Sequence, residues 1–109
     1  MLAKKYRFKN FDFEKFRNSK KIQNSLFLIR KIDSENEEKK FAVTTNNKEF
    51  KKAVLRNKIR RKIFEIIRLN LEKIHPGYYL INVRNKEALK MNFKEIEKIL
   101  LQLFSRLNA

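Results

Sequence analysis

The most informative part of this chain is the stretch Lys52-Ala53-Val54-Leu55-Arg56-Asn57-Lys58-Ile59-Arg60-Arg61-Lys62-Ile63. Apolar residues recur through and beyond it at the spacing that places them on one face of a helix: Leu55, Ile59, Ile63, Ile66 and Ile67. The opposite face carries Asn57, Lys58, Arg61 and Arg68. The sequence therefore predicts a helix that packs against a core on one side and presents cations to solvent on the other.

The net charge of the chain indicates a polyanionic partner. Lys and Arg number 28 against 12 Asp and Glu, which gives a formal net charge of +16 for 109 residues. Small soluble domains usually carry a net charge of roughly 2 to 8. Acidic residues are in excess only in the segment 33–38, which we expect to be a surface loop far from the binding face.

The helical stretch supplies the candidate phosphate-binding residues. Arg offers a fixed fork of donors that matches phosphate oxygens, Lys adds a mobile charge, and both release counterions from a polyanion. A charge run is usually only a solvated helix face, but this one is almost free of acidic residues from Lys51 to Arg61. We therefore expect the polyanion to contact Lys52, Arg56, Asn57, Lys58, Arg60, Arg61 and Arg68.

Aromatic residues offer a second kind of nucleic-acid contact. Unpaired bases stack on such rings, and the candidates are Phe13, Phe16, Phe27 and Tyr78 or Tyr79. Most of the ten Phe residues of so small a domain must lie in its core, so packing is favoured over stacking for any one ring. Arg30, a cation at the end of an apolar strand, is a better candidate for a contact in a cleft.

The residue types needed for catalysis or metal binding are scarce. The only histidine, His75, directly precedes Pro76 in a predicted turn, which favours a structural or solvated role. The absence of cysteine excludes a disulfide and a Cys-ligated zinc, and one histidine cannot form a His cluster. A single glycine, Gly77, cannot form a Gly-rich phosphate loop. We therefore expect neither a catalytic residue nor a metal ligand in the polypeptide.

Composition also bears on compartment and domain number. No apolar run approaches the roughly 20 residues that span a bilayer, and the N-terminus lacks the apolar segment of a signal peptide. The lack of cysteine permits a reducing compartment, so we expect a cytoplasmic protein without a membrane partner. With 42% hydrophobic residues, one Gly and one Pro, residues 1–109 should fold as a single domain around one core.

The first half of the chain is predicted to form a helix followed by two strands. A short helix is predicted over 12–17, with Asn10 or Asp12 able to cap it. Two β-favouring runs follow, over 22–32 and 41–45. We expect these runs to be antiparallel neighbours joined by the acidic loop.

The second half reads as helix, strand, helix. The helix of the cationic stretch begins near Asn47, which can cap it, and runs toward Asn70 or Lys73 before a break at Pro76-Gly77. A strand over 78–83 is apolar on both faces near its middle.

The last predicted helix has a capping signal at its N-terminus and one apolar face that we expect to be buried. Asn92 and Glu95 have the spacing of a capping box. The buried stripe comprises Phe93, Ile96, Leu100, Leu103, Phe104 and Leu107. The order helix, strand, strand, helix, strand, helix predicts an α/β (α+β) two-layer sandwich with helices against one mixed sheet.

Several of these stretches resemble the protein subunit of bacterial ribonuclease P. The Arg-Asn-Arg box of that family is similar to Ala53-Val54-Leu55-Arg56-Asn57-Lys58-Ile59-Arg60-Arg61. Its N-terminal aromatic helix is similar to Asp12-Phe13 followed by Lys15 and Phe16. Its last strand and helix are similar to Leu80-Ile81-Asn82-Val83-Arg84 with Ala88, Phe93 and Glu95. The resemblance covers nearly the whole chain in the right order.

The resemblance implies a function and a topology. It implies a small basic protein that assists a catalytic RNA in removing the 5′ leader from precursor tRNA. The RNA would carry the catalytic site and bind the magnesium ions, and the protein would be a non-catalytic subunit, monomeric within the complex. The family also implies a left-handed helix crossover between parallel strands, contrary to the general preference.

The resemblance assigns roles to two groups of residues. The box helix would contact the catalytic RNA near the cleavage region through Arg56, Asn57, Lys58, Arg60 and Arg61. A cleft between the N-terminal helix and the sheet would hold the single-stranded leader, with contacts from Phe13, Phe16, Phe27, Arg30 and Lys48. Several positions depart from the family pattern. Lys58 stands where Arg is usual, which loses the bidentate fork, Phe64 stands where Arg is common, and Arg30 stands where an aromatic is often found. Lys51 replaces a usual Gly, and Asn47-Lys48-Glu49 replaces the usual Ser-Lys-Lys entry to the helix.

Two other functions remain as alternatives. A general ribosomal or other RNA-binding protein would share the charge but would not stimulate leader removal at low magnesium. A self-contained nuclease would cleave precursor tRNA without any RNA partner, which the missing catalytic groups disfavour.

Overall fold

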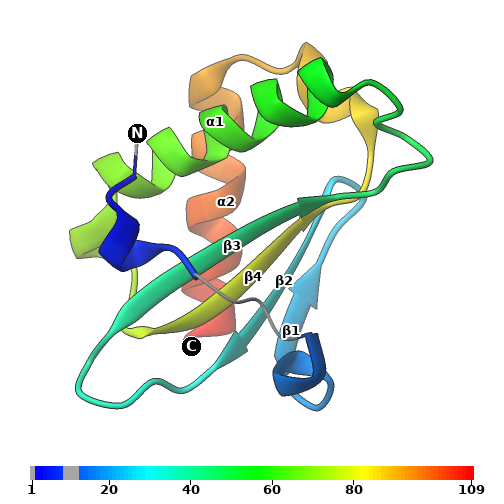
Figure 1. The fold of residues 1–109 in the computed structure, drawn as a ribbon. Coiled ribbons are helices and arrows are strands. Elements are labelled where there is room, and N and C mark those ends of the chain that lie inside the picture. The colour runs from blue at the N-terminus through cyan, green and yellow to red at the C-terminus, as the bar shows by residue number, and fades with distance from the viewer. Residues whose placement is uncertain (1, 9–12) are drawn as a thin grey trace.

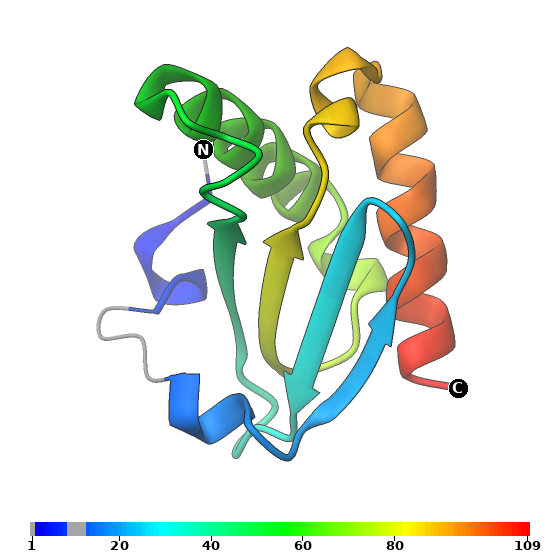
Figure 2. The same cartoon turned by 90° about the vertical axis from the view of Figure 1, so that its right-hand side faces the viewer.

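The computed structural model describes residues 2–8 and 13–109, which form a mixed sheet with two helices on one of its faces (Figures 1 and 2). The strands and helices are β1 (Lys20–Gln23), β2 (Phe27–Ile32), β3 (Lys39–Thr45), α1 (Ala53–Leu69), β4 (Gly77–Val83) and α2 (Phe93–Leu107). Short 3-10 segments are η1 (Lys4–Tyr6), η2 (Phe13–Phe16), η3 (Leu71–Lys73) and η4 (Lys86–Lys90). The predicted two-layer arrangement is confirmed.

The sheet order differs from the prediction. The strands are arranged β1-β2-β4-β3, with β4 antiparallel to β2 and parallel to β3. The expectation that 22–32 and 41–45 are neighbours is therefore wrong, because β4 lies between them. The reason is hydrophobicity: Tyr79, Leu80 and Ile81 are all buried, so β4 is apolar on both faces and takes a central place.

The predicted strand over 22–32 is a hairpin of two strands. Asn24 makes the turn, since its side-chain Oδ1 accepts the backbone N–H groups of Leu26 and Phe27, each at 2.8 Å. Asn commonly forms such turns by bonding to its own neighbouring backbone. The turn produces a β1–β2 pair in which Ile22 faces Ile29.

The crossover connection from β3 through α1 to β4 is left-handed, which is the uncommon handedness. Figure 2 shows β3 to the left of β4, both strands pointing up, and the helices behind the sheet. A crossover that passes behind the sheet from left to right is left-handed, whereas nearly all such connections are right-handed. The implied left-handed crossover is thus confirmed.

Helix α1 begins later than predicted. It starts at Ala53, and Lys52 at the N-cap position makes no side-chain capping bond. Asn47 is not the cap, because the chain first makes a turn in which the N–H groups of Glu49 and Phe50 donate to the Asn46 carbonyl at 3.0 and 2.9 Å. The fully buried ring of Phe50 anchors this loop before the helix can start.

The core lies between the sheet and the helices. Ile59, Ile63, Ile66 and Ile67 supply the buried stripe of α1, as predicted. The capping box of α2 is confirmed: Asn92 Oδ1 accepts from the Glu95 N–H at 2.9 Å, and Glu95 Oε1 accepts from the Asn92 N–H at 3.1 Å. The predicted α2 stripe is buried except for Phe93, which is partly exposed.

Candidate nucleic-acid interface

The cationic face of α1 is open to solvent. Lys52, Asn57, Lys58, Arg60, Arg61 and Arg68 are exposed, and Arg56 is half-buried. The ion pairs between described residues include none of Arg56, Arg60 and Arg61. Arg61 Nε donates to the Asn57 carbonyl at 3.4 Å, and Arg60 Nε donates to the Val43 carbonyl at 3.3 Å. Most of the five N–H groups of each guanidinium remain available for an external acceptor.

Arg56 has a structural contact within the fold. Its Nη1 donates to the carbonyls of Phe50 and Lys51 at 2.8 and 3.1 Å, which fixes the loop before α1. The first turn of α1 holds no acidic residue and no side-chain cap. The partial positive charge of the helix N-terminus is therefore added to the charges of Lys52 and Arg56, an arrangement that favours anions.

Arg68 differs from the other arginines because a carboxylate already pairs with it. Its Nε lies 3.1 and 3.0 Å from the two carboxylate oxygens of Glu65, and its Nη2 also donates to Glu65 Oε1. These bonds lower the pKa of Glu65 from 4.5 to about 2. The role of Arg68 in binding RNA stays a prediction, and its charge is largely neutralised within the chain.

Phe27 belongs to the core, so its predicted contact with the leader is corrected. Side chains of a strand alternate between the two faces of the sheet, and Phe27 and Arg30 are three positions apart. Phe27 and Ile29 point toward the helices and have 0% exposure, whereas Leu28 and Arg30 lie on the outer face and are partly exposed. A base cannot reach Phe27 in this fold.

Phe16 is also packed rather than open for stacking. The 3-10 segment η2 lies against the outer face of the sheet (Figure 2), and the Phe16 side chain is 2% exposed. Its ring meets Phe8 edge-on at 6.0 Å, and Phe8 meets Tyr78 in the same way at 5.6 Å. The Phe13 side chain, Asn10 and Asp12 lie outside the part of the chain that the structure describes.

The two tyrosines of β4 lie on opposite faces. Tyr79 is fully buried, stacked on Phe41 at 5.3 Å, and its Oη donates to the His75 carbonyl at 2.8 Å. Burial raises the pKa of Tyr79. Tyr78 is partly exposed on the outer face, and His75 is an exposed residue of the turn before β4.

The outer face of the sheet carries a pair of facing cations. Lys21 and Arg30 are direct partners across β1 and β2. Like charges in this position repel each other. Arg30 Nη1 has a long bond of 3.5 Å to the Phe16 carbonyl. Sequence reasoning found Arg30 but missed Lys21, which could be identified only once the hairpin and its register were known.

A similar pair on the inner face is compensated within the fold. Lys20 and Lys31 are also cross-strand partners. Lys20 Nζ donates to the Leu107 carbonyl at 3.2 Å, and Lys31 Nζ bonds to Asn108 Oδ1. Both cations thus lie at the C-terminus of α2, whose partial negative charge stabilises them. The outer pair has no such helix end, so an external anion suits it.

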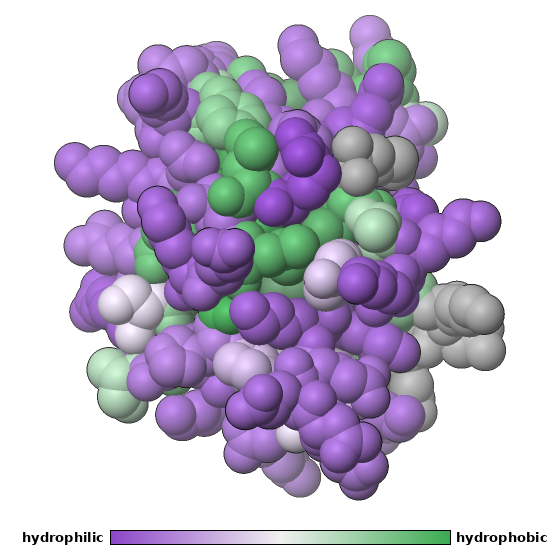
Figure 3. Space-filling model, turned by 90° about the vertical axis from the view of Figure 1, so that its left-hand side faces the viewer, coloured by the Kyte–Doolittle hydropathy of each residue, from purple (hydrophilic) through white to green (hydrophobic). Residues whose placement is uncertain are grey.

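A hollow between α1, β3 and η1 is a further concave feature of the surface. It has a volume of about 610 Å³ and is lined by Lys4, Arg7, Phe8, Phe41, Ala42, Val43, Asn57, Arg60, Arg61 and Phe64. Figure 3 shows an apolar strip in a depression bordered by hydrophilic side chains. Sequence reasoning did not connect these residues, because they come from three distant segments.

Lys48, the last predicted leader contact, lies in the loop 46–52 and is exposed. The acidic segment 33–38 is a surface loop, as expected, and it lies at the opposite end of β3 from the loop 46–52 (Figure 1).

Across residues 2–8 and 13–109, no group of three or more His, Cys, Asp or Glu side chains could hold a metal ion. No helix in the same residues is long and apolar enough to cross a membrane.

The chain is a basic α+β sandwich with a left-handed crossover and a solvent-facing cationic helix, the class of protein that is suited to a polyanionic partner. The family model described as Ribonuclease P matches residues 2–108. The ribonuclease P protein component of Alkaliphilus oremlandii is 32% identical over 101 residues, covering 92% of this chain and 88% of the relative. That of Clostridioides difficile is 31% identical over 100 residues, covering 90% and 87%. The chain belongs to the ribonuclease P protein family, whose members are subunits of a tRNA-processing ribonuclease complex.

The solved structures agree with this family. The ribonuclease P protein of Thermotoga maritima superposes with a TM-score of 0.80 at 27% identity, covering 87% of this chain and 90% of the other. A mutant of the Staphylococcus aureus protein has a TM-score of 0.82 at 23% identity, which shows the common fold. The resemblance inferred from the sequence is confirmed.

Proposed function

We propose that this chain binds the catalytic RNA of ribonuclease P through the solvent face of α1 and so assists removal of the 5′ leader from precursor tRNA. The observation that supports this most strongly is the set of exposed cations Lys58, Arg60 and Arg61, which no carboxylate of the described residues neutralises. Charges left unpaired in a chain of net charge +16 favour a polyanion over solvent alone.

The outer face of the sheet is the proposed path of the single-stranded leader. Its support is the facing pair of Lys21 and Arg30 and the partly exposed Leu28 beside them. A backbone phosphate between the two cations would relieve their repulsion. The leader would thus be held by cations, since the rings of Phe16 and Phe27 are packed inside the fold.

The chemistry of cleavage is assigned to the RNA. The magnesium ions are proposed to bind mainly to the RNA. The protein would then be a non-catalytic subunit that acts by positioning the RNA and the substrate. We propose that it works as a monomer within a cytoplasmic complex.

Reconstitution with a cognate catalytic RNA tests the proposal. The double variant Lys58→Gln with Arg61→Gln removes two exposed charges that take no part in ion pairs between described residues. Each lost phosphate contact should reduce the slope of log K against log salt by about 0.9, so the double variant should lower the slope by roughly 2 and weaken binding about tenfold or more. The melting temperature should stay within about 2 °C of the parent, because exposed substitutions rarely change stability.

The matched control is Lys94→Gln with Arg106→Gln, which removes the same charge from exposed positions of α2. It should bind the catalytic RNA nearly as well as the parent. Equal weakening by both double variants would contradict the assignment of α1. Failure of the parent chain to stimulate leader removal at low magnesium would instead favour a general RNA-binding protein.

A further inference from the structure

We infer that the hollow between α1, β3 and η1 binds one unpaired nucleotide of the RNA partner, with the base on its apolar floor and the phosphate against its cationic rim. This inference rests on the proposed RNA-binding function and adds a specific pocket to it. The hollow, of about 610 Å³, has the size of typical small-molecule sites in proteins. It lies at the edge of β3, and its lining does not include Lys21 or Arg30 of the proposed leader path.

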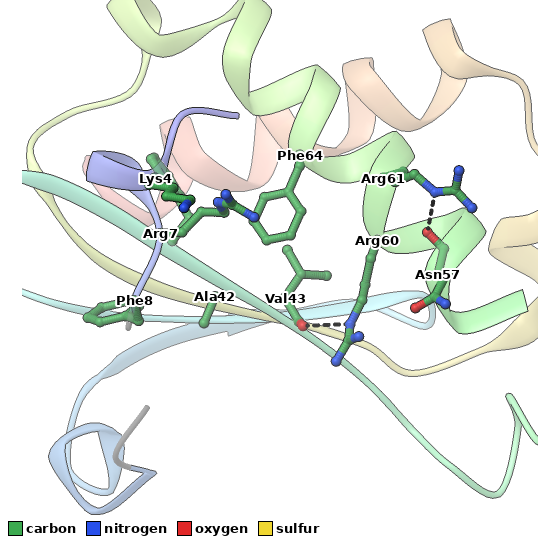
Figure 4. A pocket seen from close by; sticks show the side chains of 10 residues that line it. Lys4, Arg7, Phe8, Ala42, Val43, Asn57, Arg60, Arg61 and Phe64 are labelled. Atoms are coloured by element: carbon green, nitrogen blue, oxygen red, sulfur yellow. Dashed lines mark hydrogen bonds between the residues drawn. The ribbon is translucent and has the colours of Figure 1, made fainter. Parts of the chain in front are cut away.

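The floor of the hollow is suited to a planar base. Ala42 and Val43 of β3 line its base, while Phe64 is only partly buried on the side of α1. Figure 4 shows the Phe64 ring projecting from α1 into the hollow above Val43. Unpaired bases in RNA complexes stack on aromatic rings and on guanidinium planes.

Arg7 supplies a guanidinium at the same place. Its backbone pairs with Phe41 at the edge of β3, which fixes the origin of the side chain. Figure 4 shows its guanidinium and the Phe64 ring directed toward one another across the hollow. The Nε atom of Arg7 is buried and has no hydrogen-bond partner among the described residues. Because a buried cationic donor without an acceptor is unfavourable, an arriving acceptor would satisfy it.

The rim favours a phosphate over other ligands. Lys4, Arg60 and Arg61 line it, and no Asp or Glu belongs to the lining. Asn57 adds a side-chain amide, a group that can both donate to and accept from the edge of a base. An apolar ligand without charge would leave the cations unused, and an inorganic anion would leave the floor empty. A nucleotide combines the two chemistries.

Titration of the free chain with the four nucleoside 5′-monophosphates, followed by NMR, tests the pocket. At least one nucleotide should shift the Val43 methyl and Phe64 ring signals saturably, with an affinity about tenfold above that of the matching nucleoside or inorganic phosphate. Phe64→Leu keeps apolar packing but removes the ring, so it should weaken nucleotide binding about fivefold or more while leaving phosphate affinity unchanged. Arg7→Gln should weaken both ligands.

Arg106→Gln, at an exposed position of α2, is the matched control and should change neither affinity. The inference is overturned if no nucleotide binds saturably, if phosphate alone reproduces the shifts with equal affinity, or if Phe64→Leu leaves nucleotide binding intact. Loss of the pocket while the chain still binds catalytic RNA rejects only this inference. Nucleotide binding by a chain that does not bind catalytic RNA would support the pocket and reject the proposed function.

Discussion

The four arginines of α1 show that the neighbours of a charged residue decide what its charge does. Among the described residues, Arg61 donates to a carbonyl of its own helix, Arg60 donates to a carbonyl of β3, and Arg56 holds the loop before the helix. Arg68 is paired with Glu65. We therefore expect Arg61 to be the most available of the four for the proposed RNA contact and Arg68 the least, although all four look alike in the sequence.

Titration of Glu65 checks the pairing of Arg68. The folded chain should show a Glu65 carboxyl pKa of about 2, below the ordinary value of 4.5, because the Arg68 hydrogen bonds stabilise the carboxylate. Since the folded pKa is the lower one, this contribution to stability is complete above the unfolded pKa and is lost as the pH falls toward 2. Carbon-detected NMR from neutral to acid pH measures it.

The variant Arg68→Gln should return the Glu65 pKa toward its ordinary value. A Glu65 midpoint near 4.5 in the parent chain would show that the pair does not persist in solution. Arg68 would then be as free to bind phosphate as Arg61.

Phe27 gives a second prediction about a single residue. Truncation of a fully buried Phe to Ala usually costs about 3–5 kcal/mol of stability. Phe27→Ala should therefore lower the free energy of unfolding, measured by urea denaturation, by about this amount. Leu28→Ala, the neighbour on the outer face, should cost clearly less because Leu28 is partly exposed. Equal and small losses for both would mean that the Phe27 ring is accessible and would restore its predicted leader contact.

Elements with strong local signals were predictable from the sequence, and the pairing of strands was not. The α2 capping box depends on residues three positions apart, Asn92 and Glu95, and it was predicted correctly. The position of β4 between β2 and β3 depends on contacts about forty residues away, which no local pattern records. The start of α1 was misplaced because a buried ring, Phe50, outweighed the capping preference of Asn47.

The residues of the candidate site also fall into two groups: those that local sequence patterns predict and those that only the fold brings together. The exposed α1 cations follow from helical periodicity and were predicted. The opposite faces of Phe27 and Arg30 could have been deduced from strand alternation alone. The partnership of Lys21 with Arg30 required the register, and the hollow required three segments in space, from Arg7 to Phe64.

Paired asparagine substitutions test the control of helix ends. Asn92→Ala removes the side-chain acceptor of the α2 capping box and should destabilise the chain by about 1 kcal/mol. Asn47→Ala, in the exposed turn before α1, should change stability by less than about 0.5 kcal/mol. Urea unfolding at moderate salt measures both. A larger cost at Asn47 than at Asn92 would indicate that α1 begins earlier than in this fold.

At the scale of the whole molecule, charge and fold oppose one another. The net charge of +16 is spread over a small fold whose acidic excess lies in one loop, 33–38. Part of the repulsion is offset internally, as where Lys20 and Lys31 bind the end of α2. Exposed cations on α1 and the facing pair of Lys21 and Arg30 are not offset in this way, and the proposed RNA partner would neutralise them. We therefore expect these residues to lower the stability of the free chain, and in the proposed complex they would favour binding.

Salt should consequently stabilise the free protein. Raising sodium chloride from about 20 to about 500 mM shortens the screening length several-fold and weakens repulsion between exposed cations. We expect the melting temperature to rise by at least about 5 °C, equivalent to roughly 1 kcal/mol for a domain of this size.

Lys21→Gln should raise the melting temperature at low salt by removing the repulsion with Arg30, and the gain should shrink at high salt. Lys98→Gln, at an exposed position of α2 near Glu95, should gain less at low salt than Lys21→Gln. A melting temperature that is independent of salt, or equal gains for the two variants, would mean that repulsion between Lys21 and Arg30 does not limit the fold.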